Sequence, residues 1–341
     1  MMQRRDFYFL VPIGIVLVGA VIFEMLLSGR GPIPNPAPVP VFPGLAEHLD
    51  DLAWMRVSRG PTKVDFANVA GRWVAVEKDN YPADPARISK LLGGLAKLTI
   101  VEPDTHAAGS AGRAEPGGTA TGEPTRIVLR SRSGDTAADA TIAAAPFIAS
   151  GGSTDLLVVR KLGAEGEVLA RGSLELPGDV LSWLDRGILD LPAGRIASLE
   201  LTGTNGVRLT LTHDSSDAAF AVTGLPEGSH LKPNARLSDL AGVLTELEFD
   251  DVKPLALAEF PQSGVARATV KTFDDLAIDL RLFARDGTDW VAVAASGTGA
   301  AEAESNAIND RVARWAYAIP AARAKLLRTR IDDLAEPAKG L

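Results

Sequence analysis

Apolar and polar residues alternate in many short stretches of this chain after residue 50. Alternation with a period of two is typical of strands that bury one face of a sheet. Turn-forming residues such as Thr-Asn-Gly at 204–206 separate neighbouring stretches. The pattern predicts strands at 52–59, 62–68, 72–77, 125–132, 138–144, 155–161 and 167–174, and again at 197–203, 206–212, 219–223, 266–273, 276–284 and 289–295.

A different spacing, with apolar residues three or four positions apart, predicts a few helices. The clearest lies in NYPADPARISKLLGGLAKL, residues 80–98, where an apolar stripe would face the sheet. Asp84 stands directly before Pro85, which suits the first helical position. We therefore expect Asp84 to be the N-cap and to accept hydrogen bonds from free backbone amides. Further helices are expected at 177–190 and at 303–330, the latter interrupted by a proline.

The predicted elements of the two halves can be aligned in the same order. The best pair is PARISKLLGGLAKLTI (85–100) and NARLSDLAGVLTELEF (234–249), which share seven identical residues. Asn234 lies at nearly the place of Asp84, so we expect it to cap the corresponding helix. The predicted fold class is α+β, with two tandem copies of an antiparallel strand–helix–strand unit. Chance similarity between amphipathic elements is the alternative.

The N-terminus carries the longest apolar run, FYFLVPIGIVLVGAVIFEMLL at 7–27, with Glu24 as its single charge and Arg4 and Arg5 before it. At about 1.5 Å per residue the run spans roughly 31 Å, close to a hydrocarbon core of about 30 Å. It predicts a single-pass transmembrane signal anchor, with a cleaved signal peptide as the alternative. The arginines predict an inner-membrane protein with a cytoplasmic N-terminus and an extracytoplasmic, periplasmic bulk.

The predicted organisation has four parts. A transmembrane anchor, 1–28, precedes a Pro-rich stalk at 29–44, which is typical of polyproline II. The first repeat unit then spans 45–195 and the second 196–341. Within the first unit, residues 103–124 are rich in glycine and proline and poor in apolar bulk, which predicts a mobile loop.

Composition excludes several classes of function. The net charge of −8 and the pI near 5.2 argue against nonspecific nucleic-acid binding, which needs a basic face. The chain has no cysteine, so disulfides, zinc ribbons and cysteine nucleophiles are excluded. Its four histidines lie far apart without metal-ligand spacing, and phosphate-binding loops and nucleophile elbows are missing. We therefore expect no catalytic, cofactor or metal site, and no enzyme; the alternative is a hydrolase whose site has no sequence signature.

A second motif-like stretch is WLDRGILDLP at 183–192. Its apolar residues fall near helical spacing, while Asp185 and Arg186 lie on the other side. The stretch is either a core-facing amphipathic helix or a partner-binding patch formed by Trp183, Asp185 and Arg186.

Together, W…YPADPARISKLLGGL, LLVVRK and WLDRGILDLP resemble a family of bacterial envelope proteins with one N-terminal anchor. It is a domain-of-unknown-function family often encoded beside gliding-motility-type ABC transporter components. The resemblance implies a membrane-anchored, extracytoplasmic accessory protein of an ABC-type transport or cell-envelope system, whose partners are integral membrane transporter or envelope proteins. The alternative is a periplasmic glycan- or peptide-binding module with a groove between the two repeats, near residues 190–200.

Overall fold

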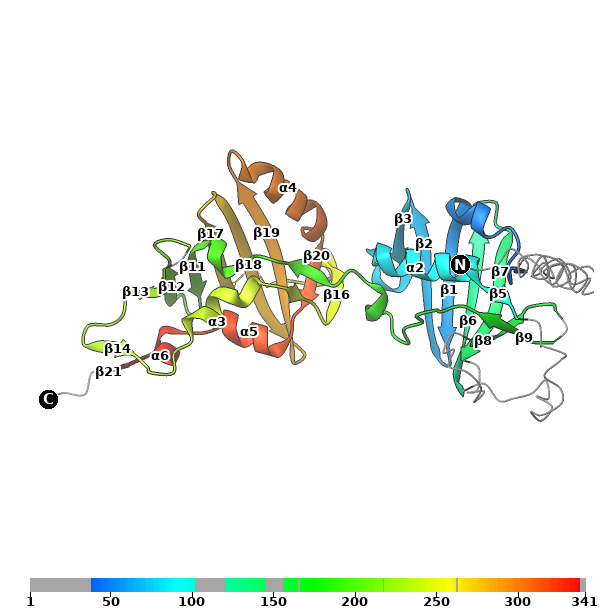
Figure 1. Cartoon of the computed structure of the whole chain (residues 1–341). Helices are drawn as coiled ribbons and strands as arrows, with labels where there is room; N and C mark the ends of the chain where they lie inside the picture. The colour runs from blue at the N-terminus through cyan, green and yellow to red at the C-terminus, as the bar shows by residue number, and fades with distance from the viewer. Residues whose placement is uncertain are drawn as a thin grey trace, which may run out of the picture. The chain divides into compact units, whose positions relative to one another are not determined.

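A computed structural model describes residues 38–101, 121–144, 156–164, 166–216, 218–261 and 263–337. From Pro40 onward the described residues belong to one compact unit. Strands make up most of its regular structure, and every ladder between them is antiparallel (Figure 1).

The first large sheet has nine strands, in the order β4-β3-β2-β1-β6-β7-β8-β9-β5. Side chains alternate along β1, where Met55 and Val57 are buried and Arg56 and Ser58 are partly exposed. This alternation directs one face of the sheet toward the core. The strand bounds are β1 Leu52–Arg59, β2 Thr62–Val69, β3 Arg72–Ala75, β4 Tyr81–Pro82, β5 Thr99–Ile100, β6 Thr121–Ser131, β7 Thr136–Ala144, β8 Leu156–Lys161 and β9 Val168–Arg171.

The second large sheet has eight strands, in the order β13-β12-β11-β17-β18-β19-β20-β16. Two ribbons of two strands each, β10–β15 and β14–β21, accompany it. The strand bounds are β10 Gly187–Leu189, β11 Ile196–Thr202, β12 Arg208–Thr212, β13 Ala221–Thr223, β14 Ser229–Leu231, β15 Leu247–Glu248, β16 Asp251–Pro254, β17 Ala266–Thr272, β18 Leu276–Arg285, β19 Thr288–Gly297, β20 Trp315–Ala318 and β21 Ala335–Pro337.

Helices are few and short beside these sheets. The α-helices are α2 Pro85–Lys97, α3 Leu237–Ala241, α4 Ala301–Val312, α5 Ala321–Leu327 and α6 Ile331–Leu334. The 3-10 helices are η1 Ala46–Asp51, η2 Val76–Lys78, η3 Leu181–Trp183, η4 Ala193–Arg195, η5 Gly242–Leu244 and η6 Leu255–Leu257. Among them α2 and α4 are long enough to cover part of a sheet.

Helix α2 begins at a strong cap. The Asp84 carboxylate accepts from the backbone amides of Ala86 and Arg87, and Pro85 fills the first helical position. Its buried face, formed by Ile88, Leu91, Leu92 and Leu95, joins the main hydrophobic core. The same core takes in buried side chains of both large sheets, including those of Phe66 and Leu280. A smaller cluster around Phe283 and Trp290 lies apart from it.

Helix α4 is held against β19 by a side chain and by a close backbone approach (Figure 1). The Asn309 amide accepts from the backbone nitrogen of Ala295 and donates to its carbonyl oxygen, both at 2.8 Å. At Gly297, where β19 ends, a Cβ atom would collide with the backbone of Ala301. These contacts fix the helix that forms one wall of the groove described below.

The predicted fold class is wrong. The described chain is mainly antiparallel β-sheet built around two large sheets, and not an α+β repeat of strand–helix–strand units with an anchor. The two sheets do share one order of successive strands, β3-β2-β1-β6-β7-β8-β9 in the first and β13-β12-β11-β17-β18-β19-β20 in the second. The predicted strand positions agree closely with the observed ones. The error lies in the predicted helices, which are fewer and shorter in the structure.

Three helix predictions need correction. Residues 177–190, expected as one helix, form η3 and β10 instead. The expected helix 303–330 divides into α4, β20 and α5, because Trp315–Ala318 pairs with β16 and β19. Asn234 does not cap α3, since the helix begins at Leu237, with Arg236 at the N-cap position and no side-chain cap bond.

The N-terminal predictions also change. No helix within the described ranges is both long enough and apolar enough to cross a membrane. The predicted anchor, 7–27, and most of the predicted stalk lie outside the described residues. The single-pass signal anchor, and the inner-membrane location derived from it, are therefore not supported. Of the predicted loop 103–124, residues 121–124 belong to β6 and the remainder lies outside the described residues.

Candidate functional site

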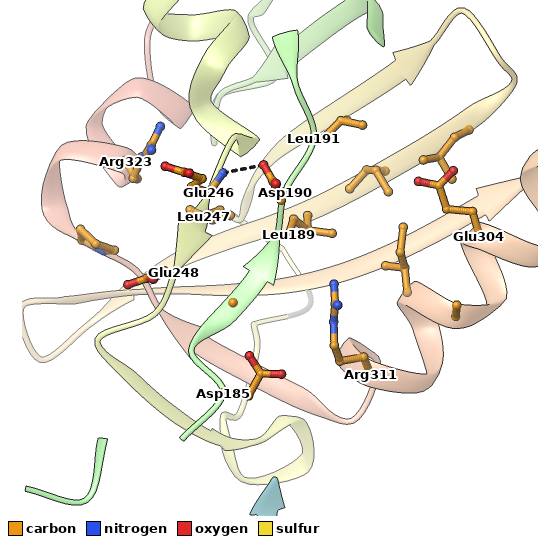
Figure 2. A pocket seen from close by; sticks show the side chains of 16 residues that line it. Asp185, Leu189, Asp190, Leu191, Glu246, Leu247, Glu248, Glu304, Arg311 and Arg323 are labelled. Carbon is orange, nitrogen blue, oxygen red and sulfur yellow. Dashed lines mark hydrogen bonds between the residues drawn. The ribbon is translucent and has the colours of Figure 1, made fainter. Parts of the chain in front are cut away.

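A groove of about 850 Å³ lies beside the β10–β15 ribbon (Figure 2). Helix α4 forms one wall, the start of α5 another, and β18 contributes to its floor. Its lining consists of Asp185, Gly187, Leu189, Asp190, Leu191, Glu246, Leu247, Glu248, Leu276, Ile278, Glu304, Ala307, Ile308, Arg311, Pro320 and Arg323. A concave site of this size lies within the range of about 300–1,000 Å³ typical of ligand pockets.

The β10–β15 ribbon is fixed by backbone and side-chain bonds on both strands. Leu189 pairs with Leu247 across the ladder. Beyond the ladder, the Leu191 amide donates to the Leu244 carbonyl at 3.0 Å. The Asp190 carboxylate accepts from the Glu246 amide at 3.1 Å, which holds the turn where Glu246 has a positive φ of 46°. Asp190 and Glu246 are thus neighbours at one end of the groove, as Figure 2 shows.

Two arginines belong to the groove walls and are bound to backbone carbonyls. Arg311 of α4 donates to the Ile188 carbonyl of β10 at 2.9 Å, which joins the helix to the ribbon. Arg323 of α5 donates to the carbonyls of Gly242 and Thr245, both at 3.0 Å. Each guanidinium therefore ties a helix to the segments beside the ribbon.

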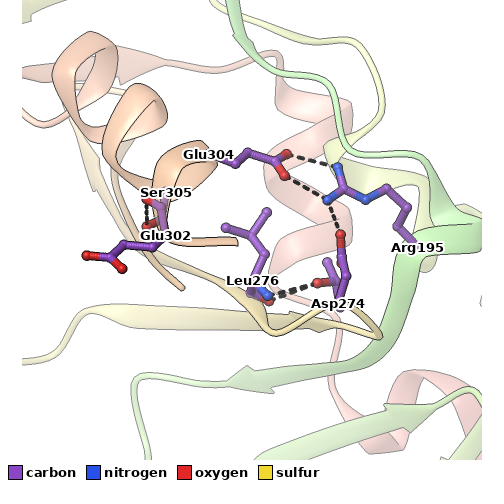
Figure 3. Close-up of polar contacts among 7 residues, drawn as sticks. Arg195, Asp274, Leu276, Glu302, Glu304 and Ser305 are labelled. Atoms are coloured by element: carbon purple, nitrogen blue, oxygen red, sulfur yellow. Dashed lines mark hydrogen bonds and ion pairs between the residues drawn. The ribbon is translucent and has the colours of Figure 1, made fainter. Parts of the chain in front are cut away.

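A third arginine holds the start of α4 from outside the groove (Figure 3). Arg195 of η4 contacts both carboxylate oxygens of Glu304 at 2.9 Å and the carboxylate of Asp274 at 2.6 Å. Glu304 and Asp274 in turn raise the pKa of Arg195. The hydrogen bond from Arg195 lowers the pKa of Glu304. The nearby Thr272 hydroxyl and then Arg195 lower the pKa of Asp274. This arrangement favours the charged form of all three groups.

Two buried tyrosines lie close to the other end of the groove. The Tyr81 hydroxyl donates to the Asp185 carbonyl at 3.1 Å, and its ring meets that of Tyr317 edge to face. Burial raises the pKa of Tyr81 to about 12 and also raises the pKa of Tyr317. Both phenols are therefore neutral at physiological pH. The Tyr317 hydroxyl lies near that of Tyr81, and the two contribute to each other's pKa shift, but it makes no hydrogen bond of normal geometry with a described residue.

Carboxylates dominate the charge of the groove. Five line it, against the two arginines. The side chains of Asp185, Asp190, Glu246 and Glu248 are exposed, whereas the floor residues Leu276 and Ile278 are buried. The result is an acidic rim above an aliphatic floor, to which Ile308 of α4 contributes a half-buried side chain.

The predicted partner patch is not formed as a surface. Trp183 is only 1% exposed and packs edge to face on Phe66, so it belongs to the core. Arg186 donates to the Phe249 carbonyl at 2.9 Å and is half-buried. Asp185 alone of the three lines the groove. Asp84, Pro85 and Asn234 lie elsewhere and do not line it.

The described residues hold no group of three or more His, Asp or Glu side chains suited to a metal ion. His213, which lines a second and smaller depression, has both ring nitrogens against backbone carbonyls, Ile196 at 3.0 Å and Ala218 at 2.6 Å. Its ring also stacks on Phe220. These contacts give His213 a role in holding the 213–220 turn.

Most groove residues were missed from the sequence. Asp190, Glu246, Glu304, Arg311 and Arg323 come from four separate elements or turns, and none stands in a recognisable motif. The one available signal was the acidic, glycine-containing stretch at 183–192, which supplies one wall.

No protein-family model, curated protein or solved structure matches this chain.

Proposed function

We propose that this protein is a non-enzymatic binding module whose groove holds a segment of a partner polypeptide. The observation that carries the proposal is the groove itself, in which an aliphatic floor is bordered by charged side chains. Apolar contact supplies affinity in such sites, and a few placed polar groups supply orientation and specificity.

A polypeptide suits this lining better than a glycan. Sugar rings are commonly held by stacking on aromatic side chains, and the groove lining contains no aromatic residue. Ala307, Ile308 and Pro320 instead offer aliphatic surface for apolar side chains, above the buried Leu276 and Ile278. The ribbon strand β10 pairs with β15 alone in the described chain, so the groove borders a short strand that has one partner.

The carboxylates whose pKa is clearly shifted are not suited to act as general acids. A general acid needs a raised pKa at neutral pH. Among the described residues, the carboxylates with a clearly shifted pKa are Glu175, Asp179, Asp274 and Glu304, and all four are shifted downward by hydrogen-bond donors. Of these, Glu304 lines the groove, and its partner Arg195 keeps it ionised.

The resemblance in sequence suggests where the partner belongs. It favours an accessory role in an ABC-type transport or cell-envelope system, with transporter or envelope proteins as partners. We include this role in the proposal, with the groove as the surface that contacts them.

Photo-crosslinking from α4 tests the proposal. A benzoylphenylalanine at Ala307, which lines the groove, is compared with one at Asn306, which is exposed and does not line it. We expect a defined polypeptide, identified by mass spectrometry as a transporter or envelope component, from position 307 only. Ile308→Glu in the same chain should abolish that product, because it places a charge over the aliphatic floor. Equal products from both positions, or none from 307, would contradict the proposal.

A further inference from the structure

We infer that the segment held in the groove is cationic and extended, with two basic side chains separated by about four or five residues. This inference rests on the proposed binding function and adds the chemistry of the ligand. It follows from the charges of the rim, their pairing and their separation along the ribbon.

The acidic rim is only partly neutralised within the chain. Asp185, Asp190 and Glu246 are exposed and form no ion pair with any described residue. Glu248 has the side chain of Arg186 at 3.7 Å, and Glu304 is paired with Arg195. A ligand of positive charge would therefore meet carboxylates whose charge no described cation neutralises.

The basic residues of the lining do not offset this rim for an anionic ligand. Arg311 and Arg323 have their guanidinium groups bound to backbone carbonyls of Ile188, Gly242 and Thr245. An anion would have to compete with these bonds, and it would also face five carboxylates. Charge complementarity thus selects a basic partner and disfavours an acidic one.

The floor fits the aliphatic part of the same ligand. Above the buried Leu276 and Ile278, the side chains of Ile308 and Pro320 are half-buried and that of Ala307 is exposed. Lysine and arginine stems bury their methylene groups on such surfaces while their charged ends reach polar groups. Small apolar residues between the two basic ones would occupy the remaining floor.

The carboxylates also set a spacing. Asp185 lies at one end of β10, and Asp190 lies at the other end beside Glu246 (Figure 2). Five positions of extended chain separate Asp185 from Asp190, which at about 3.3 Å per residue is at most roughly 16 Å. An extended peptide that runs along β10 would reach both ends with basic side chains four or five residues apart.

Fluorescence anisotropy of labelled peptides on the full chain tests this. The probe is a nine-residue peptide with lysines at positions 2 and 7 and alanine, valine and leucine elsewhere. Two comparison peptides carry glutamine or glutamate at positions 2 and 7. We expect the lysine peptide to bind about tenfold or more tightly than the glutamine peptide at low salt, and to weaken as salt is added. The glutamate peptide should bind most weakly.

Protein variants localise the effect. Asp190→Asn with Glu246→Gln keeps the side-chain oxygen that accepts the Glu246 amide and removes two charges. This double variant should bind the lysine peptide about tenfold more weakly than the unmodified chain does, and its affinity for the glutamine peptide should be unchanged. The matched control is Glu302→Gln with Asp310→Asn, two exposed carboxylates of α4 that do not line the groove. It should bind like the unmodified chain. Asp185→Asn supplies an independent single variant, and circular dichroism checks that each one is folded.

The outcomes separate this inference from the proposed function. If the glutamine or glutamate peptide binds as well as the lysine peptide, the groove binds peptides but the cationic inference is wrong. If the groove variants and the control variant lose the same amount of affinity for the lysine peptide, the cationic inference is also wrong. If none of the peptides binds and position 307 gives no crosslink, the proposed function fails together with it.

Discussion

The guanidinium of Arg195 donates two hydrogen bonds of 2.9 Å to the carboxylate of Glu304. Because Arg195 also binds Asp274 at 2.6 Å, one side chain joins η4, the turn between β17 and β18, and the first turn of α4 (Figure 3). Bidentate pairs of this kind fix geometry as well as charge. Arg195 therefore helps to set the position of the α4 wall of the groove.

Arg195→Gln should lower the free energy of unfolding by about 1 kcal/mol or less, because all three side chains are at least a third exposed and solvent screens the pairs. The lowered pKa values of Glu304 and Asp274 make this contribution pH-dependent. It is complete above their ordinary values of 4.5 and 3.8 and is lost as the pH falls through the folded-state values. Urea unfolding at pH 7 and pH 3 measures both effects.

The difference between the Arg195→Gln chain and the unmodified one should thus shrink at the lower pH. Arg314→Gln, an exposed arginine without an ion pair among the described residues, is the matched control and should change neither value. If the difference in the free energy of unfolding between the two chains grows at pH 3, Arg195 does not stabilise the chain through ionised Glu304 and Asp274.

Asp84→Ala should lower the free energy of unfolding by about 1 kcal/mol, since it removes the acceptor for the Ala86 and Arg87 amides at the start of α2. Asp84→Asn is the matched comparison, because asparagine caps about as well and only the charge is lost. Chemical denaturation should rank the asparagine variant close to the unmodified chain. Equal losses in both would show that the ion pair with Arg87 matters more than the cap.

Tyr81 and Tyr317 should respond differently to loss of the hydroxyl. Tyr81→Phe removes the donor to the Asp185 carbonyl and should cost about 1 kcal/mol of stability. Tyr317→Phe removes a buried hydroxyl that makes no hydrogen bond of normal geometry with a described residue, so it should cost less stability than Tyr81→Phe. Thermal unfolding of the two variants side by side gives the comparison. A larger loss for Tyr317→Phe would mean that its hydroxyl is bonded.

Trp183→Ala should destabilise the chain by about 3–5 kcal/mol, because the side chain is among the largest that are fully buried. Trp183→Phe should cost clearly less, since it keeps most of the packing against Phe66 and removes an indole nitrogen without a described partner. Denaturation in urea distinguishes the two. An alanine variant as stable as the unmodified chain would contradict the burial of Trp183 in the core.

The sequence predicts the strands and α2 well, for local reasons. Alternation along segments such as Leu276–Arg285 and the Asp84 cap depend only on neighbouring residues. The helix prediction at 177–190 is wrong because Ile188 and Leu189 are both buried, on opposite sides of a short ribbon strand. Apolar residues buried on both sides of a strand cannot be told from a helical stripe by spacing alone.

The prediction of a second helix aligned with α2 is wrong for a different reason. Its sequence resembles that of α2, yet α3 has five residues and passes into η5 at Gly242. Without a side-chain cap its first turn gains little local stability, so tertiary packing decides its length. The groove could not be predicted either, because its residues meet only once β10 has paired with β15 and Arg311 has joined α4 to the Ile188 carbonyl.

Hydrogen exchange of the full chain, with and without the lysine peptide defined above, tests the role of the groove most directly. Binding should slow exchange in residues 185–191, at 246–248 and along α4, Ala301–Val312, because these segments form its walls. The central strands β1 and β6 of the nine-stranded sheet should exchange as before. Protection that appears in β1 and β6 with none beside β10 would contradict the assignment of the groove as the binding site.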